Sequence, residues 1–202
     1  MMHTDMRFIG ITGGVGAGKS EILNYLKKRP HTRVMLADEI ARGLMEPQTE
    51  CYIRLREEFA GEEIYLPGGE FDRERLAAVI FGDEKKRARL NAVVHPAVKA
   101  YVEQQAALER ARGELKLLVL EAALLIEEHY DKICDELWYI DACESVRRAR
   151  LKASRGYSDE RIDGIFASQL KDNVYRSVCT VVIDNNGALL TALEQVEGAL
   201  RR

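Results

Sequence analysis

The chain has 202 residues, of which 47% are hydrophobic and 31% are charged, and its formal net charge is −3. This length fits one α/β domain with room for an insertion, and the weakly acidic balance offers no basic field for nucleic acid. No apolar run approaches the ~18 residues that span a bilayer, and residues 1–5 lack the apolar core of a signal peptide, so we expect a cytoplasmic protein without nucleic-acid or membrane partners.

The first predicted element is a short apolar strand, Phe8–Ile11, which runs into a glycine-rich loop. The loop has the spacing G-x-x-x-x-G-K-[ST], and helical spacing of apolar residues follows over 22–26. Strand, loop and helix therefore stand in the order that a phosphate-binding loop requires. This phosphate loop consists of Gly13, Gly14, Val15, Gly16, Ala17, Gly18, Lys19 and Ser20. We predict that its N–H groups bind phosphates, that Lys19 reaches the β- and γ-phosphates, and that Ser20 ligates Mg²⁺.

Further apolar runs predict four more strands, at residues 33–37, 116–120, 136–141 and 180–183. Residues 144–175 are predicted to be helical with a break at Gly156, and a last helix is expected over 188–200. Strands that alternate with helices favour an α/β fold, a five-stranded parallel sheet with helices on both faces.

The gap between the second and third strands is long for a simple crossover. It is helical in character, with breaks at Gly61 and at residues 67–69. We therefore expect a helical, substrate-binding insertion at about 44–113 and a lid at about 144–177. The core would then comprise about 6–43, 114–143 and 178–202.

Three carboxylates fall at the carboxyl ends of predicted strands, where ligands of such sheets lie. Asp38 follows the second strand, and two interpretations are equally open: a group that accepts a hydroxyl proton or holds a metal-bound water, or a helix N-cap. Glu121 ends the most apolar strand, where a carboxylate is costly unless it meets a cation or a metal. Asp141 is predicted to cap the helix that follows.

A basic cluster marks the predicted helix after residue 143: Arg147, Arg148, Arg150, Lys152 and Arg155. Arginines on a closing lid stabilise the negative charge of phosphoryl transfer. A solvated basic face is the alternative for most of them, and we keep Arg150 and Arg155 as functional candidates.

His95 precedes Pro96, and proline suits the first turn of a helix, so we expect His95 at a helix cap. A lone histidine of this kind is more often structural than catalytic.

Six segments carry a family pattern: Ile11–Ser20 (ITGGVGAGKS), Ala37–Arg42 (ADEIAR), Phe71–Phe81 (FDRERLAAVIF), Leu90–Pro96 (LNAVVHP), Leu124–Glu127 (LLIE) and Val182–Gly187 (VIDNNG). In this order they resemble the motifs of the dephospho-coenzyme A kinase family over nearly the whole chain. The sequence departs from that pattern in four places. Leu36 replaces the first Asp of a D-A-D segment, Ala123 replaces a proline, Glu21 stands where threonine is usual, and Arg150 and Arg155 lie one residue further apart than in the common lid.

The resemblance implies a P-loop fold of the nucleotide-kinase type that transfers the γ-phosphoryl of ATP, with Mg²⁺, to the ribose 3′-hydroxyl of dephospho-CoA. It implies catalytic roles for Asp38, Lys19 and Arg150. We also expect a monomer or weak homo-oligomer. Nucleotide contacts would come from the phosphate loop with Glu21, Arg155 and Asn185. Acceptor contacts would come from Asp38, Arg42, His95 and Pro96.

Two alternatives stay open at this point. A P-loop kinase of another small-molecule or nucleotide acceptor would share the loop and the lid, but it would not need the H-P and D-N-N-G segments. A GTP-binding switch would need a guanine-reading N-K-x-D segment, and the sequence contains none.

Overall fold

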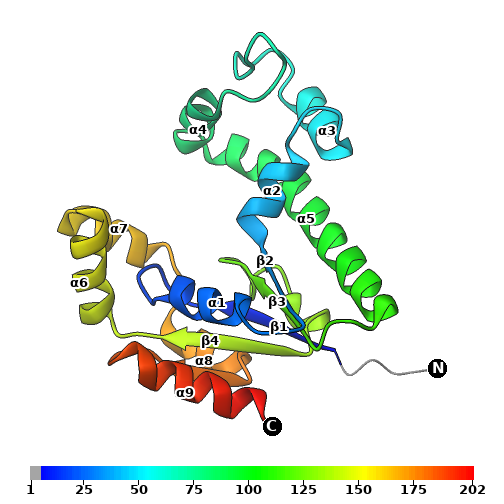
Figure 1. Ribbon diagram of the computed structural model, residues 1–202. Coiled ribbons are helices and arrows are strands. Elements are labelled where there is room, and N and C mark those ends of the chain that lie inside the picture. Colours follow the sequence, from blue (N-terminus) through cyan, green and yellow to red (C-terminus); the bar gives the residue numbers. More distant parts are fainter. Residues whose placement is uncertain (1–5) are drawn as a thin grey trace. The chain divides into compact units, whose positions relative to one another are not determined.

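A computed structural model describes residues 6–202, so the expectation about residues 1–5 lies outside the described part. Its strands are β1 (Arg7–Thr12), β2 (Thr32–Leu36), β3 (Leu117–Glu121), β4 (Glu136–Asp141) and β5 (Val181–Asp184) (Figure 1). Its helices are α1 (Lys19–Lys27), α2 (Ala37–Leu44), α3 (Glu50–Glu58), α4 (Arg73–Phe81), α5 (Glu84–Arg112), α6 (Glu144–Arg155), α7 (Asp159–Ala167), α8 (Asp172–Val178) and α9 (Leu189–Leu200), with a 3₁₀ turn at η1 (Tyr130–Lys132).

The chain forms two compact units. The sheet unit consists of the residues up to Met35 and those from Glu109 onward, and the helical unit consists of Leu36–Leu108. Over residues 6–202, no helix combines the length and the apolar character that crossing a membrane requires.

The five strands of the sheet unit lie in the order β2-β3-β1-β4-β5, which places β1 in the centre. β1 pairs in parallel with both β3 and β4, and β4 pairs in parallel with β5. In this register Ile9 lies opposite Val119, and Ile11 lies opposite Trp138. The predicted five-stranded parallel sheet is confirmed, and β4 has the predicted bounds.

The central strands are buried on both sides. Leu137 to Asp141 of β4 are all buried, and because successive side chains of a strand point to opposite faces, both faces of the sheet must be covered. On one face the ring of Tyr139 stacks on Tyr175 of α8, with centroids 4.7 Å apart. Trp138, which is fully buried, points to the other face. The prediction of a sheet covered on both faces is therefore confirmed.

The helical unit contains residues 84–108 of the long helix α5, which passes through Pro96 without ending. The prediction of a helix cap at His95 is therefore wrong. The helix continues because its buried side chains recur at helical spacing on both sides of the proline, which is itself exposed. These side chains are Leu90, Val93, Val94, Val98, Val102 and Ala106. A proline inside a helix costs about 3 kcal/mol, and burying each large apolar side chain contributes about 1.5–3 kcal/mol, so packing outweighs the proline.

Asp38 and Asp141, which the sequence offered as helix N-caps, do not cap a helix in the structure. Asp38 is the second residue of α2, whose N-cap is Leu36, so the N-cap interpretation of Asp38 is wrong. Asp141 ends β4, and its buried carboxylate forms an ion pair with Arg176 of α8, whose side chain is 48% exposed. The N-cap of α6 is Cys143, two residues later, so the prediction that Asp141 caps this helix is wrong.

Candidate active site

The phosphate loop joins the carboxyl end of β1, the central strand, to the first turn of α1. Gly13 has φ 152°, and a Cβ atom there would lie 2.6 Å from the carbonyl oxygen of Ile140. Gly18, with φ 88°, is the N-cap of α1. The turn is closed by a hydrogen bond of 3.0 Å from the Ala17 N–H to the Gly14 carbonyl. Glycine is thus required where the backbone turns, and the N-terminus of α1 opens at an anion-binding position.

Lys19 carries the positive charge of the phosphate loop. Its Nζ donates to the Gly13 carbonyl at 2.6 Å and lies 3.6 Å from Oε1 of Glu121, at the end of β3. Both side chains are mostly buried, with exposed fractions of 16% and 18%. The sequence left a cation or a metal open as the partner of Glu121, and the structure shows the Lys19 ammonium beside it. Ser20 and Glu21 follow in the first turn of α1, and both are exposed.

Arg150 and Asn185, both predicted from the sequence, lie against the loop. Arg150 donates from Nη1 to the Ala17 carbonyl at 3.2 Å and from Nη2 to the Asn185 carbonyl at 2.8 Å. Nδ2 of Asn185 donates to the same Ala17 carbonyl at 2.7 Å. The Asn185 N–H in turn donates to the Asp141 carbonyl at 2.8 Å, which anchors this residue to the end of β4. The Ala17 peptide is therefore held by two side chains.

Arg147 also contacts the loop, and sequence reasoning left it in the solvated cluster. Its Nε donates to the Val15 carbonyl at 2.9 Å, and its Nη2 donates to Oε1 of Gln169. Its guanidinium carbon lies 4.2 Å from the ring centroid of Phe166, and only 9% of the residue is exposed. The sequence held one sign of this position. Leu151, an apolar residue, follows Arg147 by four residues and so shares its face of α6, and both residues are buried.

The remaining basic side chains of α6 lie away from the loop. Arg148 and Lys152 pair with Asp159 at 2.8 and 2.7 Å, and their hydrogen bonds, that of Lys152 first, hold the pKa of this exposed carboxyl below its ordinary value. Lys152 is exposed, as the interpretation of a solvated basic face predicts, whereas Arg148 is half-buried and its guanidinium carbon lies 5.5 Å from the ring centroid of Phe166. Arg155 is exposed, with its guanidinium carbon 5.8 Å from the ring centroid of Tyr157.

The helical unit carries the other predicted residues. Asp38 and Arg42 are exposed on α2, and Nε of Arg42 donates to the Asp38 carbonyl at 3.2 Å. Arg42 lines a hollow of about 450 Å³ together with Met45, Glu46, Leu66, Glu70, Phe71, Asp72, Arg73, Glu74 and Leu76.

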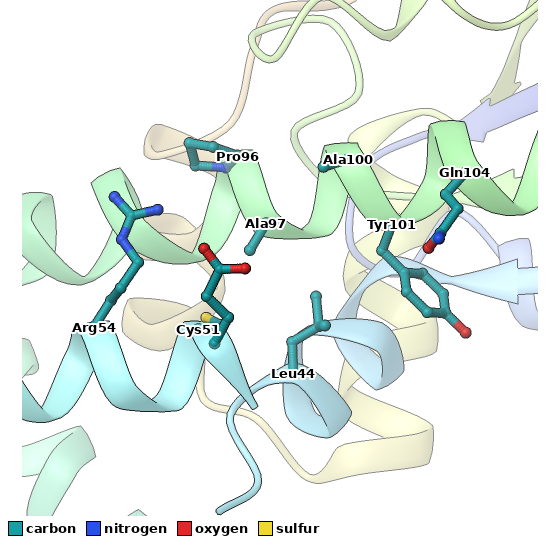
Figure 2. A pocket seen from close by; sticks show the side chains of 9 residues that line it. Leu44, Cys51, Arg54, Pro96, Ala97, Ala100, Tyr101 and Gln104 are labelled. Carbon is teal, nitrogen blue, oxygen red and sulfur yellow. The ribbon is translucent and has the colours of Figure 1, made fainter. Parts of the chain in front are cut away.

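Pro96 lines a second hollow of the helical unit, of about 640 Å³, and half-buried His95 precedes it on α5. Figure 2 shows Cys51 and Arg54 of α3 across from Ala97 and Ala100 of α5. The lining also includes Leu44, Glu50, Tyr101 and Gln104. The lining combines apolar side chains with one acidic, one basic and two neutral polar side chains.

Comparison with known proteins decides the family. The model of the dephospho-CoA kinase family matches residues 7–191. The chain belongs to the dephospho-CoA kinase family. The dephospho-CoA kinase of Shouchella clausii is 34% identical over 96% of this chain and 97% of its own length. That of Deinococcus radiodurans is 38% identical over 98% of this chain and 93% of its own. The resemblance inferred from six motifs is confirmed.

Solved structures agree with the P-loop kinase fold. A crystal structure from Thermus thermophilus superposes with a TM-score of 0.79 at 28% identity and covers 97% of this chain and 96% of its own. The dephospho-CoA kinase of Campylobacter jejuni gives a TM-score of 0.67 at 18% identity, over 96% and 95% of the two chains. Shikimate kinase from Bacteroides thetaiotaomicron gives 0.53 at 12%, over 97% of each chain. The last two likenesses concern the fold alone.

Proposed function

We propose that the protein transfers the γ-phosphoryl group of ATP to the ribose 3′-hydroxyl of dephospho-CoA, which yields CoA and ADP and completes coenzyme A synthesis. The observation that carries this proposal is the dephospho-CoA kinase family match over residues 7–191. It is supported by the phosphate loop, in which the Lys19 side chain folds back onto the Gly13 carbonyl. Phosphoryl transfer from a nucleoside triphosphate needs such a loop and lysine.

The nucleotide would bind with its phosphates in the phosphate loop, and Mg²⁺ would bind beside them. The residues present suit this metal, because Mg²⁺ takes few protein oxygens and completes its shell with phosphate and water. Residues 6–202 contain no group of three His, Cys, Asp or Glu side chains that could hold a metal, while the exposed Ser20 hydroxyl offers one ligand in the first turn of α1. The bound metal would neutralise charge on the transferring group.

The acceptor would be held by the helical unit. Arg42 is a cation at the edge of a hollow and suits the acceptor's phosphates or ribose, and His95 and Pro96 supply contacts from α5. Asp38, at the start of α2, would orient the 3′-hydroxyl and accept its proton as the phosphoryl group moves. Closure of the lid arginines would exclude water, which would otherwise take the phosphoryl group.

A coupled assay of ADP release tests the acceptor. We expect turnover with dephospho-CoA and the appearance of CoA, identified by mass, in equal amounts with ADP. The panel should include shikimate, adenosine and nucleoside monophosphates, each at matched concentration. If one of these were phosphorylated with a higher kcat/KM than dephospho-CoA, the alternative of a kinase with another acceptor would replace the proposal.

The lid arginines give a prediction on kinetics. Alanine at Arg150 or at Arg155 is expected to lower kcat more than it weakens ATP binding, because a lid cation acts on charge that develops in the transition state. The measurement is kcat at saturating substrates together with the dissociation constant of ATP by calorimetry. Arg148→Ala is the matched control, since Arg148 lies on the same helix and pairs with Asp159.

The test decides the role of Arg150 and the role of Arg155 independently. A rise in KM for ATP with unchanged kcat would assign the side chain to ground-state binding. Kinetics equal to those of the Arg148→Ala control would return that residue to the solvated face.

A further inference from the structure

The carbonyl groups of the phosphate loop are held by side chains from distant parts of the sheet unit. Arg147 of α6 binds the Val15 carbonyl, while Arg150 and Asn185 bind the Ala17 carbonyl. In a planar trans peptide, the C=O and the N–H of the next residue point in opposite directions. A side chain that fixes one of these carbonyls therefore also fixes the direction of the following N–H.

The Arg147 guanidinium is itself tightly held. Its Nη2 donates to Gln169, which follows α7, and its face lies on the ring of Phe166. It also packs against Gly14, where a Cβ atom would collide with the guanidinium. The planar fork of arginine can bind two acceptors and stack at the same time, which a lysine ammonium cannot do. The residue is thus built into the structure and differs from Lys152 and Arg155, the exposed cations of the same helix.

We propose that Arg147 is a positioning residue of the phosphate loop: by holding the Val15 carbonyl, it turns the Gly16 N–H toward the bound phosphates, and Gln169 and Phe166 hold the guanidinium in place. This inference rests on the nucleotide-binding part of the proposed function and not on the identity of the acceptor. It also joins helices α6 and α7 to the phosphate loop through one side chain.

The test follows the amide resonances of Gly16 and Gly18 in the ¹⁵N-labelled full chain during titration with inorganic tripolyphosphate. In the unmodified protein both amides are expected to shift. In Arg147→Ala the Gly16 shift should be largely lost, whereas Gly18, which follows the independently held Ala17 carbonyl, should keep its shift at saturation. Tripolyphosphate and ATP should each bind about tenfold or more weakly, as expected for loss of a hydrogen bond from a charged donor. Lys152→Ala, which removes an exposed cation of the same helix, should match the unmodified protein.

Two further variants separate orientation from charge and from folding. Arg147→Lys keeps the charge but loses the planar fork, so it should restore less than half of the lost Gly16 shift; full restoration would overturn the proposal in favour of simple charge attraction. Gln169→Ala keeps the arginine but removes one of the two groups that hold its guanidinium, so it should reduce the Gly16 shift to a smaller extent than Arg147→Ala. If Arg147→Ala does not fold, the Gln169→Ala variant tests the proposal on its own.

Three results would overturn the proposal: an unchanged Gly16 shift in a folded Arg147→Ala protein, equal losses at Gly16 and Gly18, or no effect of Gln169→Ala. None of these readouts uses dephospho-CoA. A chain that failed the acceptor assay could still pass this test, and the reverse also holds.

Discussion

Lys19→Ala is expected to lower kcat by at least about 10³-fold, the upper range for loss of one preorganised charge-stabilising donor. Nζ of Lys19 lies 2.6 Å from the Gly13 carbonyl and 3.6 Å from the Glu121 carboxylate, so the cation is already placed at the phosphate loop before transfer begins. Phosphoryl transfer involves little covalent chemistry for the protein, which makes such charge placement the main contribution to rate.

The measurement is kcat with dephospho-CoA, together with the midpoint of thermal unfolding on the same preparation. Lys27→Ala is a matched control, because Lys27 is an exposed lysine in the last turn of the same helix. Near-normal kcat in a folded Lys19→Ala enzyme would remove this lysine from the mechanism.

Asp38→Asn is expected to lower kcat by about 10²-fold or more, in the range of lost acid–base catalysis. A ribose hydroxyl is a weak acid, so a carboxylate is needed to orient it and take its proton late in transfer. The structure also predicts that the substitution changes the free energy of unfolding only slightly. Asp38 is exposed in the first turn of α2 and is not its N-cap, so asparagine forfeits only the dipole interaction, about 0.3–1 kcal/mol.

Glu39→Gln tests whether the effect belongs to this position, because Glu39 is the neighbouring exposed carboxylate in the same turn of α2. It should leave kcat and the unfolding midpoint nearly unchanged. An Asp38→Asn enzyme as active as this control would leave the protein without an identified base, and the rate would then have to come from positioning and electrostatics.

Much of the sheet unit could be predicted because its signals are local. A phosphate loop depends on glycines at fixed offsets after an apolar strand, and it lies where it was predicted. The five strands begin and end within one residue of their predicted bounds, although Ala37, predicted to end the second strand, is the first residue of α2. A general argument also indicated that Glu121 needs a partner, since a carboxylate at the end of an apolar strand is costly alone, but it did not decide between a cation and a metal.

The errors arose where long-range packing overrides a local rule. Pro96 lies inside α5 because apolar side chains before and after it pack on one face, and a rule for helix ends does not include that packing. Asp141 binds Arg176, a residue that no nearby spacing connects to it. Arg147 was missed for a similar reason, because its partners Val15 and Gln169 lie on separate segments of the chain.

The order of strands in the sheet has a consequence for synthesis of the chain on the ribosome. The phosphate loop follows the first strand, yet that strand lies between β3 and β4, which are both made much later. The Ala17 carbonyl is held by Asn185, which follows the last strand. A nascent or prematurely terminated chain therefore carries the whole G-x-x-x-x-G-K-S sequence without the contacts that shape it. ATP binding should accordingly arise only when almost the entire polypeptide has emerged, so that incomplete chains do not sequester nucleotide.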